Sequence, residues 1–237
     1  MRFLLAVLAL AAPVHAPTLA ADCGGDGGLR ARSTWLETSD HVRLYAIEAG
    51  RGRTAVVLLH EGGGNLCEEL PYAKTLVAAG LRVVAIDFRN DGESAKSTRH
   101  PVALGRDIAA AVKLAHDGGA KRVFLIGASM GGAAAVNNSG GLQLAGVISL
   151  SGTRLWPGFG VNEPGPQALR APLLYLGSRD DGLAPLKQAR WVFDHAGSKD
   201  KRMVLYDGST HGWDLVQSVS FARAARTTIV RWIRSHA

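Results

Sequence analysis

Three residue types that together perform acyl transfer occur in the order serine, aspartate, histidine, each after a short apolar run. Ser129 is the middle residue of a G-x-S-x-G motif at positions 127–131 and follows a predicted strand at 122–126. A serine hydroxyl is a poor nucleophile unless a base takes its proton and a carboxylate orients that base. His211, in the loop after a predicted strand at 202–206, is the candidate base. Because the carboxyl ends of parallel strands meet at one edge of a sheet, the sequence predicts that these side chains converge.

The position of the G-x-S-x-G motif, between a predicted strand and a predicted helix, makes it a more specific signal for a catalytic serine. A bare G-x-S-x-G match is a weak signal in a chain that holds 29 glycines among 237 residues. Here a strand precedes the motif and a helix is expected from Met130, which is typical of the sharp elbow that exposes a serine hydroxyl. Gly127 and Gly131 suit such an elbow, because larger side chains would collide with neighbouring backbone. Ser129 is therefore the predicted nucleophile.

Two adjacent aspartates compete for the role of the acid. Asp180 and Asp181 both follow the apolar stretch at residues 173–176. Either carboxylate, placed after a sheet strand, would lie at the edge that carries Ser129 and His211. Position relative to the strand leaves the choice between the two open.

Strands and helices alternate along the chain, which predicts an α/β fold with a mostly parallel twisted sheet flanked by helices. The last helix has an apolar face and an arginine-rich face, and we expect the apolar face to pack on the core. The predicted strands are 41–48, 54–59, 81–86, 122–126, 144–150, 173–176 and 202–206, and the predicted helices are 66–79, a segment through 104–115, a segment from 130, 185–195 and 213–235.

Five motifs in this order resemble the α/β-hydrolase fold family, and the resemblance covers the chain from about residue 40. They are His60-Glu61-Gly62-Gly63-Gly64, the stretch 87–94, Gly127 to Gly132, Asp181 with Pro185, and the stretch 207–212. The His60-Glu61 pair is similar to the dienelactone-hydrolase branch. That branch uses a cysteine nucleophile where this chain presents Ser129, so the resemblance does not imply dienelactone as the substrate.

The resemblance implies roles for further residues. The acid of the family commonly precedes a proline by four residues, which favours Asp181 before Pro185, whereas counting three residues from Gly177 points to Asp180 as the alternative. Two backbone N–H groups must bind the oxyanion that forms on the attacked carbonyl. By the family pattern, Met130 supplies one N–H group, and Glu61 or Gly62 supplies the other.

The expected activity is that of a serine hydrolase, a carboxylesterase that cleaves esters through an acyl-enzyme on Ser129. No metal or organic cofactor is expected, since His60-Glu61 lacks a second histidine four residues on. The alternatives are a peptidase or a lipase with the same triad, and a non-catalytic binding protein on the same scaffold.

A long irregular segment at residues 152–172 is the part of the chain that could cover the site. It contains four prolines and four glycines, which forbid a regular helix. Trp156 and Phe159 are expected either to line the substrate pocket or to anchor the segment on the core, and Trp213 is a further pocket candidate. With no large cap domain inserted after Leu150, small and accessible ester substrates are expected.

The N-terminus has the pattern of an export signal. Arg2 is followed by an apolar run, and small residues near Ala21 suit cleavage by a signal peptidase. We expect residues 1–21 to be a signal peptide, 22–40 an N-terminal extension and 41–237 the hydrolase domain. The mature protein is then periplasmic or secreted and keeps no stable membrane anchor.

Export bears on the two cysteines, Cys23 and Cys67. An oxidising compartment permits a disulfide between them, but the sequence does not fix their separation, so a bridge and two free thiols both stay open.

Composition excludes several other classes of protein. With 47% hydrophobic and 20% charged residues, the chain is neither disordered nor collagen-like. The net charge of +7 is spread along the sequence, so no nucleic-acid partner is expected. Nothing in the sequence indicates an oligomeric state.

Overall fold

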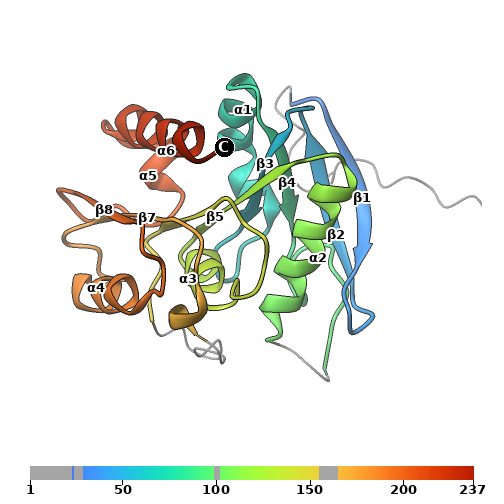
Figure 1. The fold of residues 1–237 in the computed structure, drawn as a ribbon, viewed down its shortest axis with the longest axis horizontal. Coiled ribbons are helices and arrows are strands. Elements are labelled where there is room, and N and C mark those ends of the chain that lie inside the picture. The colour runs from blue at the N-terminus through green and yellow to red at the C-terminus, as the bar shows by residue number, and fades with distance from the viewer. Residues whose placement is uncertain (1–22, 24–28, 99–101, 155–164) are drawn as a thin grey trace, which may run out of the picture.

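An eight-stranded sheet forms the centre of the molecule in this computed structural model, which describes residues 23, 29–98, 102–154 and 165–237. The strand order is β1-β2-β4-β3-β5-β6-β7-β8 (Figure 1). β2 pairs antiparallel with both β1 and β4, and the other neighbouring strands are parallel. The fold class predicted from the sequence is thereby confirmed. The strands are β1 (Ala31–Glu37), β2 (Arg43–Ala49), β3 (Thr54–Leu59), β4 (Arg82–Ile86), β5 (Arg122–Ala128), β6 (Gly146–Leu150), β7 (Leu173–Ser178) and β8 (Lys201–Tyr206).

Helices cover both faces of this sheet (Figure 1). One face packs against α1 (Leu70–Ala78), α5 (Asp214–Gln217) and α6 (Ala222–His236). The other face packs against α2 (Leu104–Asp117), α3 (Met130–Asn137) and α4 (Leu186–His195). Two short 3₁₀ helices, η2 (Leu66–Glu69) and η3 (Pro166–Ala168), lie in the connections. Among the described residues, no helix is both long and apolar enough to span a bilayer.

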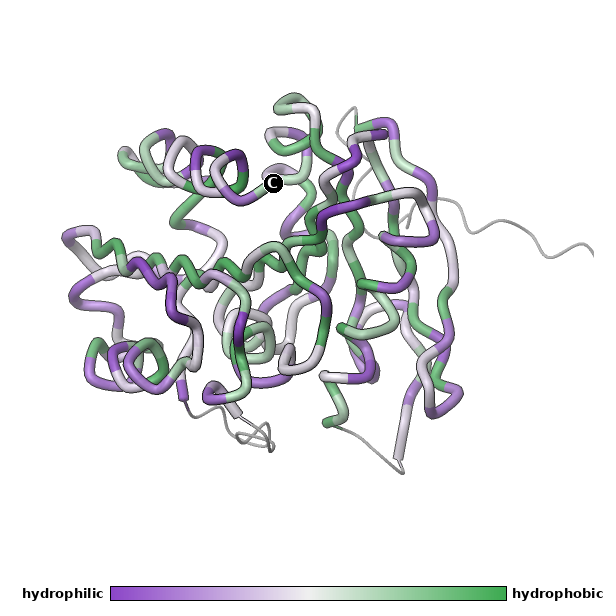
Figure 2. Tube along the Cα trace, viewed as in Figure 1, coloured by the Kyte–Doolittle hydropathy of each residue, from purple (hydrophilic) through white to green (hydrophobic). Residues whose placement is uncertain are grey.

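The central strands are apolar along their whole length because both of their faces are covered. β3 reads Thr-Ala-Val-Val-Leu-Leu, and its last five residues are buried. Figure 2 shows hydrophobic residues along these strands and a mixture of hydrophilic and hydrophobic residues along the helices. This rigid layer ends, on its carboxyl side, in the loops that carry the candidate catalytic residues.

The sheet begins earlier in the chain than predicted. The segment assigned as an extension, 22–40, contains β1, which pairs with β2 over seven residues from Ala31 to Glu37. β1 is an edge strand with partly exposed side chains, so it lacks the apolar run that marks the central strands. The predicted signal peptide, 1–21, lies outside the described residues.

The C-terminal helix is also different from the prediction, because the segment 213–235 divides into α5 and α6. The residues between the two helices are Ser218, Val219, Ser220 and Phe221, and serine and valine have weak helix preference. Arg226 Nη1 donates to the Val216 carbonyl oxygen at 3.1 Å and so satisfies the end of α5. The prediction that α6 turns its apolar face to the core is correct, since Ala225, Ile229, Trp232 and Ile233 are buried.

Candidate active site

Ser129 occupies a tight turn between β5 and α3. Its backbone has φ 49° and ψ −113°, a strained conformation for a residue with a side chain. A Cβ at Gly127 would lie 2.2 Å from the Gly131 carbonyl oxygen, and one at Gly131 would lie 2.2 Å from the Leu59 carbonyl oxygen. Only glycine fits at both positions, which is the physical reason for the G-x-S-x-G spacing.

His211 is paired with Asp181 at the same edge of the sheet. His211 Nδ1 lies 2.8 Å from Asp181 Oδ2 and 3.0 Å from Oδ1, while Leu183 and Ala184 donate their N–H groups to Oδ1. Burial acts to raise the pKa of Asp181, but the hydrogen bonds from His211, Ala184 and Ser151, with the charge of His211, together lower it. Burial acts to lower the pKa of His211, but the hydrogen bond and charge of Asp181, with smaller effects of the charges of Glu61 and Asp214, together raise it. The arrangement fixes the imidazole with Nε2 left for proton transfer.

Asp180 lies beside this pair but in a different environment. It is exposed, and its backbone N–H donates to the Gly208 carbonyl oxygen at 3.0 Å. Asp181 is only 4% exposed. Of the two aspartates that the sequence left open, Asp181 is the one whose carboxylate contacts His211.

Ser151, which sequence reasoning missed, supports the pair from the end of β6. Its hydroxyl hydrogen-bonds the Asp181 carboxylate, and its Oγ accepts the Gly212 N–H at 3.2 Å. Ser151 has φ 52°, so a strained backbone aims this side chain. The sequence signal that could have identified Ser151 is a polar residue directly after the apolar strand β6.

The oxyanion donors proposed from the sequence are Met130 and either Glu61 or Gly62. Met130 is the first residue of α3, where backbone N–H groups have no partner within the helix. The Glu61 N–H donates to Glu68 Oε1 at 2.8 Å and is therefore already engaged. This contact favours Gly62 as the second donor.

His60 braces the loop that carries Gly62. The His60 side chain is fully buried, its Nε2 accepts the Phe88 N–H at 2.9 Å, and its Nδ1 lies 2.7 Å from the Glu61 carbonyl oxygen. Burial lowers the pKa of His60 to about 4. With both ring nitrogens engaged and its pKa lowered, His60 holds this loop in place.

Comparison with known protein families finds a match over most of this chain. A model of the alpha/beta hydrolase family matches residues 56–234. The chain belongs to the alpha/beta hydrolase family. Membership confirms the resemblance inferred from the sequence and the predicted class of enzyme, a serine hydrolase.

Solved structures of other alpha/beta hydrolases are similar in fold. An esterase from Pyrococcus furiosus has a TM-score of 0.74 at 17% identity, covering 91% of this chain and 95% of that one. A monoacylglycerol lipase from Paleococcus ferrophilus has a TM-score of 0.69 at 19% identity, covering 82% and 99%. A soluble variant of the Saccharomyces cerevisiae monoglyceride lipase has a TM-score of 0.72 at 15% identity, covering 90% and 97%.

Of the three residues predicted to line the substrate pocket, the structure describes only Trp213. Trp213 is only 4% exposed and packs beside Tyr72 at a ring distance of 6.1 Å, so it belongs to the core and not to an open pocket. The short helix α5, which starts after Trp213, draws it inward. Trp156 and Phe159 lie outside the described residues.

Among the described residues, no hydrogen bond joins Ser129 to His211. Within the same part of the chain, no group of three or more histidine, cysteine, aspartate or glutamate side chains could hold a metal ion.

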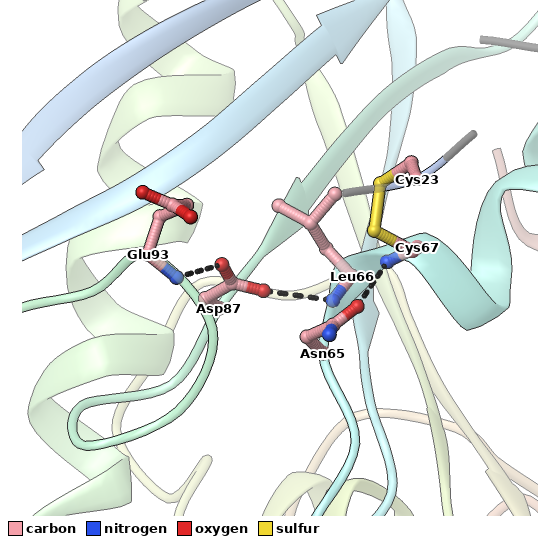
Figure 3. Close-up of a disulfide and its surroundings, with 6 residues drawn as sticks. All are labelled: Cys23, Asn65, Leu66, Cys67, Asp87 and Glu93. Atoms are coloured by element: carbon pink, nitrogen blue, oxygen red, sulfur yellow. Dashed lines mark hydrogen bonds between the residues drawn. A yellow bond between two sulfur atoms is a disulfide. The ribbon is translucent and has the colours of Figure 1, made fainter. Parts of the chain in front are cut away.

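A disulfide joins Cys23 to Cys67 near the start of η2, just after the loop 60–64 (Figure 3). The two Cα atoms are 5.2 Å apart across 44 residues of sequence. Asn65 Oδ1 accepts the Cys67 N–H at 3.0 Å, and Asp87 accepts the N–H groups of Leu66 and Glu93 (Figure 3). The bridge therefore ties the N-terminal segment to a well-anchored turn.

Reduction of this disulfide is expected to lower the melting temperature, because the unfolded chain loses a constraint that contributes up to about 4 kcal/mol. The measurement is thermal unfolding with and without reductant, with a Cys23→Ser, Cys67→Ser double variant as the control that reductant should not affect. A thiol count on unreduced, denatured protein tests the bridge directly. Two reactive thiols per chain would contradict it.

Proposed function

We propose that this hydrolase cleaves ester bonds through an acyl-enzyme on Ser129, as a carboxylesterase acting on small, accessible esters. The observation that carries the proposal is the His211–Asp181 pair, with Nδ1 2.8 Å from Oδ2, on the loops after β7 and β8. β5, which ends at the Ser129 elbow, lies in the same parallel array.

In the proposed reaction, His211 Nε2 takes the proton of Ser129 as its Oγ attacks the ester carbonyl carbon. The resulting oxyanion is bound by the N–H groups of Met130 and Gly62. His211 then gives the proton to the departing alcohol, and the acyl group stays on Ser129. Water, deprotonated by His211, releases the acid and restores the serine.

The choice of esters over other acyl compounds is supported by the fold that this chain shares with esterases and monoglyceride lipases. The described residues between β6 and β7 contain only the short helix η3, which supports small substrates over those that need a large cap.

Hydrolysis of p-nitrophenyl esters from acetate to dodecanoate tests the proposal, with Ser129→Ala as the matched control. We expect the highest kcat/KM on the shorter acyl chains and none above background in the control. Cleavage of peptide substrates without cleavage of esters would assign a peptidase instead. Binding without turnover would assign a non-catalytic binding protein.

Export to the periplasm or the medium is part of the proposal. It is supported by the signal-like sequence before Asp22 and by the disulfide, since disulfides persist in oxidising compartments. N-terminal sequencing of the exported protein is expected to begin at Asp22. Full-length chain confined to the cytoplasm would contradict export.

A further inference from the structure

Glu61 connects the loop 60–64, the oxyanion loop with the proposed donor Gly62, to the loop 207–212, the histidine loop with His211. Its Oε1 accepts the Trp213 N–H at 2.7 Å, although the two residues are 152 positions apart. A Cβ at Gly212 would lie 1.7 Å from the same oxygen, so the carboxylate rests directly on the backbone that follows His211. Gly212 has φ 54°, a backbone conformation that favours glycine, and the Glu61 carboxylate occupies the space where a side chain would begin.

Side chains from two other loops accept hydrogen bonds from the backbone that follows His211. The Gly212 N–H donates to Ser151 Oγ, and the Trp213 N–H donates to Glu61 Oε1. Since Asp181 holds the ring itself, the position of the imidazole depends on loops after three different strands. Glu61 is the contact that relates this histidine loop to the oxyanion loop.

The backbone of Glu61 is in turn hydrogen-bonded by a side chain of η2. Its backbone N–H donates to Glu68 Oε1 at 2.8 Å. A Cβ at Gly64 would lie 2.3 Å from that carboxylate oxygen, so the glycine leaves the space that Glu68 fills. Because Cys67 in the same turn is bridged to Cys23, the support of Glu61 extends to the disulfide.

Three acidic side chains act on the histidine. Asp181, Glu61 and Asp214 act on His211 and raise its pKa against the effect of burial. Glu61 in turn faces Glu68 and Glu69, whose pKa values are raised mainly by burial.

We propose that Glu61 is a positioning residue for His211, which rests on the proposed hydrolysis by Ser129 and His211. Its carboxylate fixes the Trp213 N–H and so the backbone that carries the imidazole. Its negative charge favours the imidazolium that forms when His211 takes the serine proton. The same residue links the placement of the histidine to that of the oxyanion loop, because the Gly62 N–H is the next backbone donor after Glu61.

Two substitutions separate the charge of Glu61 from its hydrogen bond. Glu61→Gln keeps an oxygen that can accept the Trp213 N–H but removes the charge, and we expect kcat to fall about 10-fold with KM unchanged. Glu61→Ala removes both, and we expect a loss of about 100-fold, because small displacements of catalytic groups are costly. Glu93→Gln, at an exposed carboxylate after β4, is the matched control and should leave activity and its pH profile unchanged.

The pH profile is the readout that a purely structural role would not move. Activity requires neutral His211, so kcat/KM rises with pH through the pKa of His211. Loss of the Glu61 charge lowers that pKa, and the acidic limb of Glu61→Gln should move to lower pH. NMR titration of the His211 ring in the wild type and in Glu61→Gln, assigned with His211→Gln, checks the same shift without activity.

An unchanged ring titration in Glu61→Gln would overturn the proposal, as would a raised KM with unchanged kcat, which would make Glu61 a substrate contact. If Glu61→Ala does not fold, Glu61→Gln still decides. A wild-type protein without esterase activity would refute the proposed function, whereas the NMR shift would still report on Glu61.

Discussion

Replacement of Ser129 by alanine is expected to lower kcat for ester hydrolysis by about three to six orders of magnitude. Without the Oγ no acyl-enzyme can form, and only the oxyanion hole and substrate binding remain to assist direct attack by water. The measurement is steady-state turnover of p-nitrophenyl acetate at matched protein concentration. KM should change little, since the hydroxyl contributes to the transition state more than to ground-state binding.

The loss in Ser129→Ala must be separated from a loss of the fold. A φ of 49° carries a similar conformational cost for alanine and for serine. The melting temperature of the variant should therefore match that of the wild type. Ser220→Ala, at an exposed serine between α5 and α6, is the control for a general effect of the substitution. Mass spectrometry after treatment with an organophosphonate should locate the adduct on Ser129. Wild-type activity in Ser129→Ala, or an adduct elsewhere, would assign another nucleophile.

The parts of this fold that follow from local sequence were predictable. The apolar run of β3 has the same bounds, 54–59, in the prediction and in the structure, because a strand buried on both faces shows in its composition. The turn at Ser129 could be predicted because the spacing of its two glycines is local and Gly127 is required by its contact with Gly131, four residues on. The contact that requires Gly131, with the Leu59 carbonyl oxygen at the end of β3, is long in range and was not visible in the sequence.

The remaining features of the site depend on contacts between distant residues. Glu61 is hydrogen-bonded to Trp213, 152 positions away, and Ser151 to Gly212, 61 positions away. Neither pair leaves a periodic pattern in the sequence. Trp213 is a pocket candidate in the sequence, but the structure places it in the core beside α5. Burial of that kind is decided by the layer of helices and not by neighbours in the chain.

Replacement of Asp181 by asparagine is expected to lower kcat by about 10⁴-fold, whereas Asp180→Asn should stay within about threefold of the wild type. The amide keeps the size of the carboxylate, and its oxygen can still accept the N–H groups of Leu183 and Ala184. It cannot stabilise the imidazolium, and its NH₂ group favours the tautomer of His211 that lacks a free acceptor at Nε2.

The pH profiles of the two asparagine variants separate an electrostatic role from a merely structural one. Asp181 raises the pKa of His211, so its removal should move the acidic limb of kcat/KM to lower pH, in addition to lowering the plateau. Asp180 is exposed and does not contact the ring, so Asp180→Asn should keep the limb of the wild type. A larger loss of kcat in Asp180→Asn, together with a shifted limb in that variant, would transfer the role of the acid to Asp180. Equal small effects in both would show that His211 works without a carboxylate partner, which the contact of 2.8 Å between Nδ1 and Oδ2 argues against.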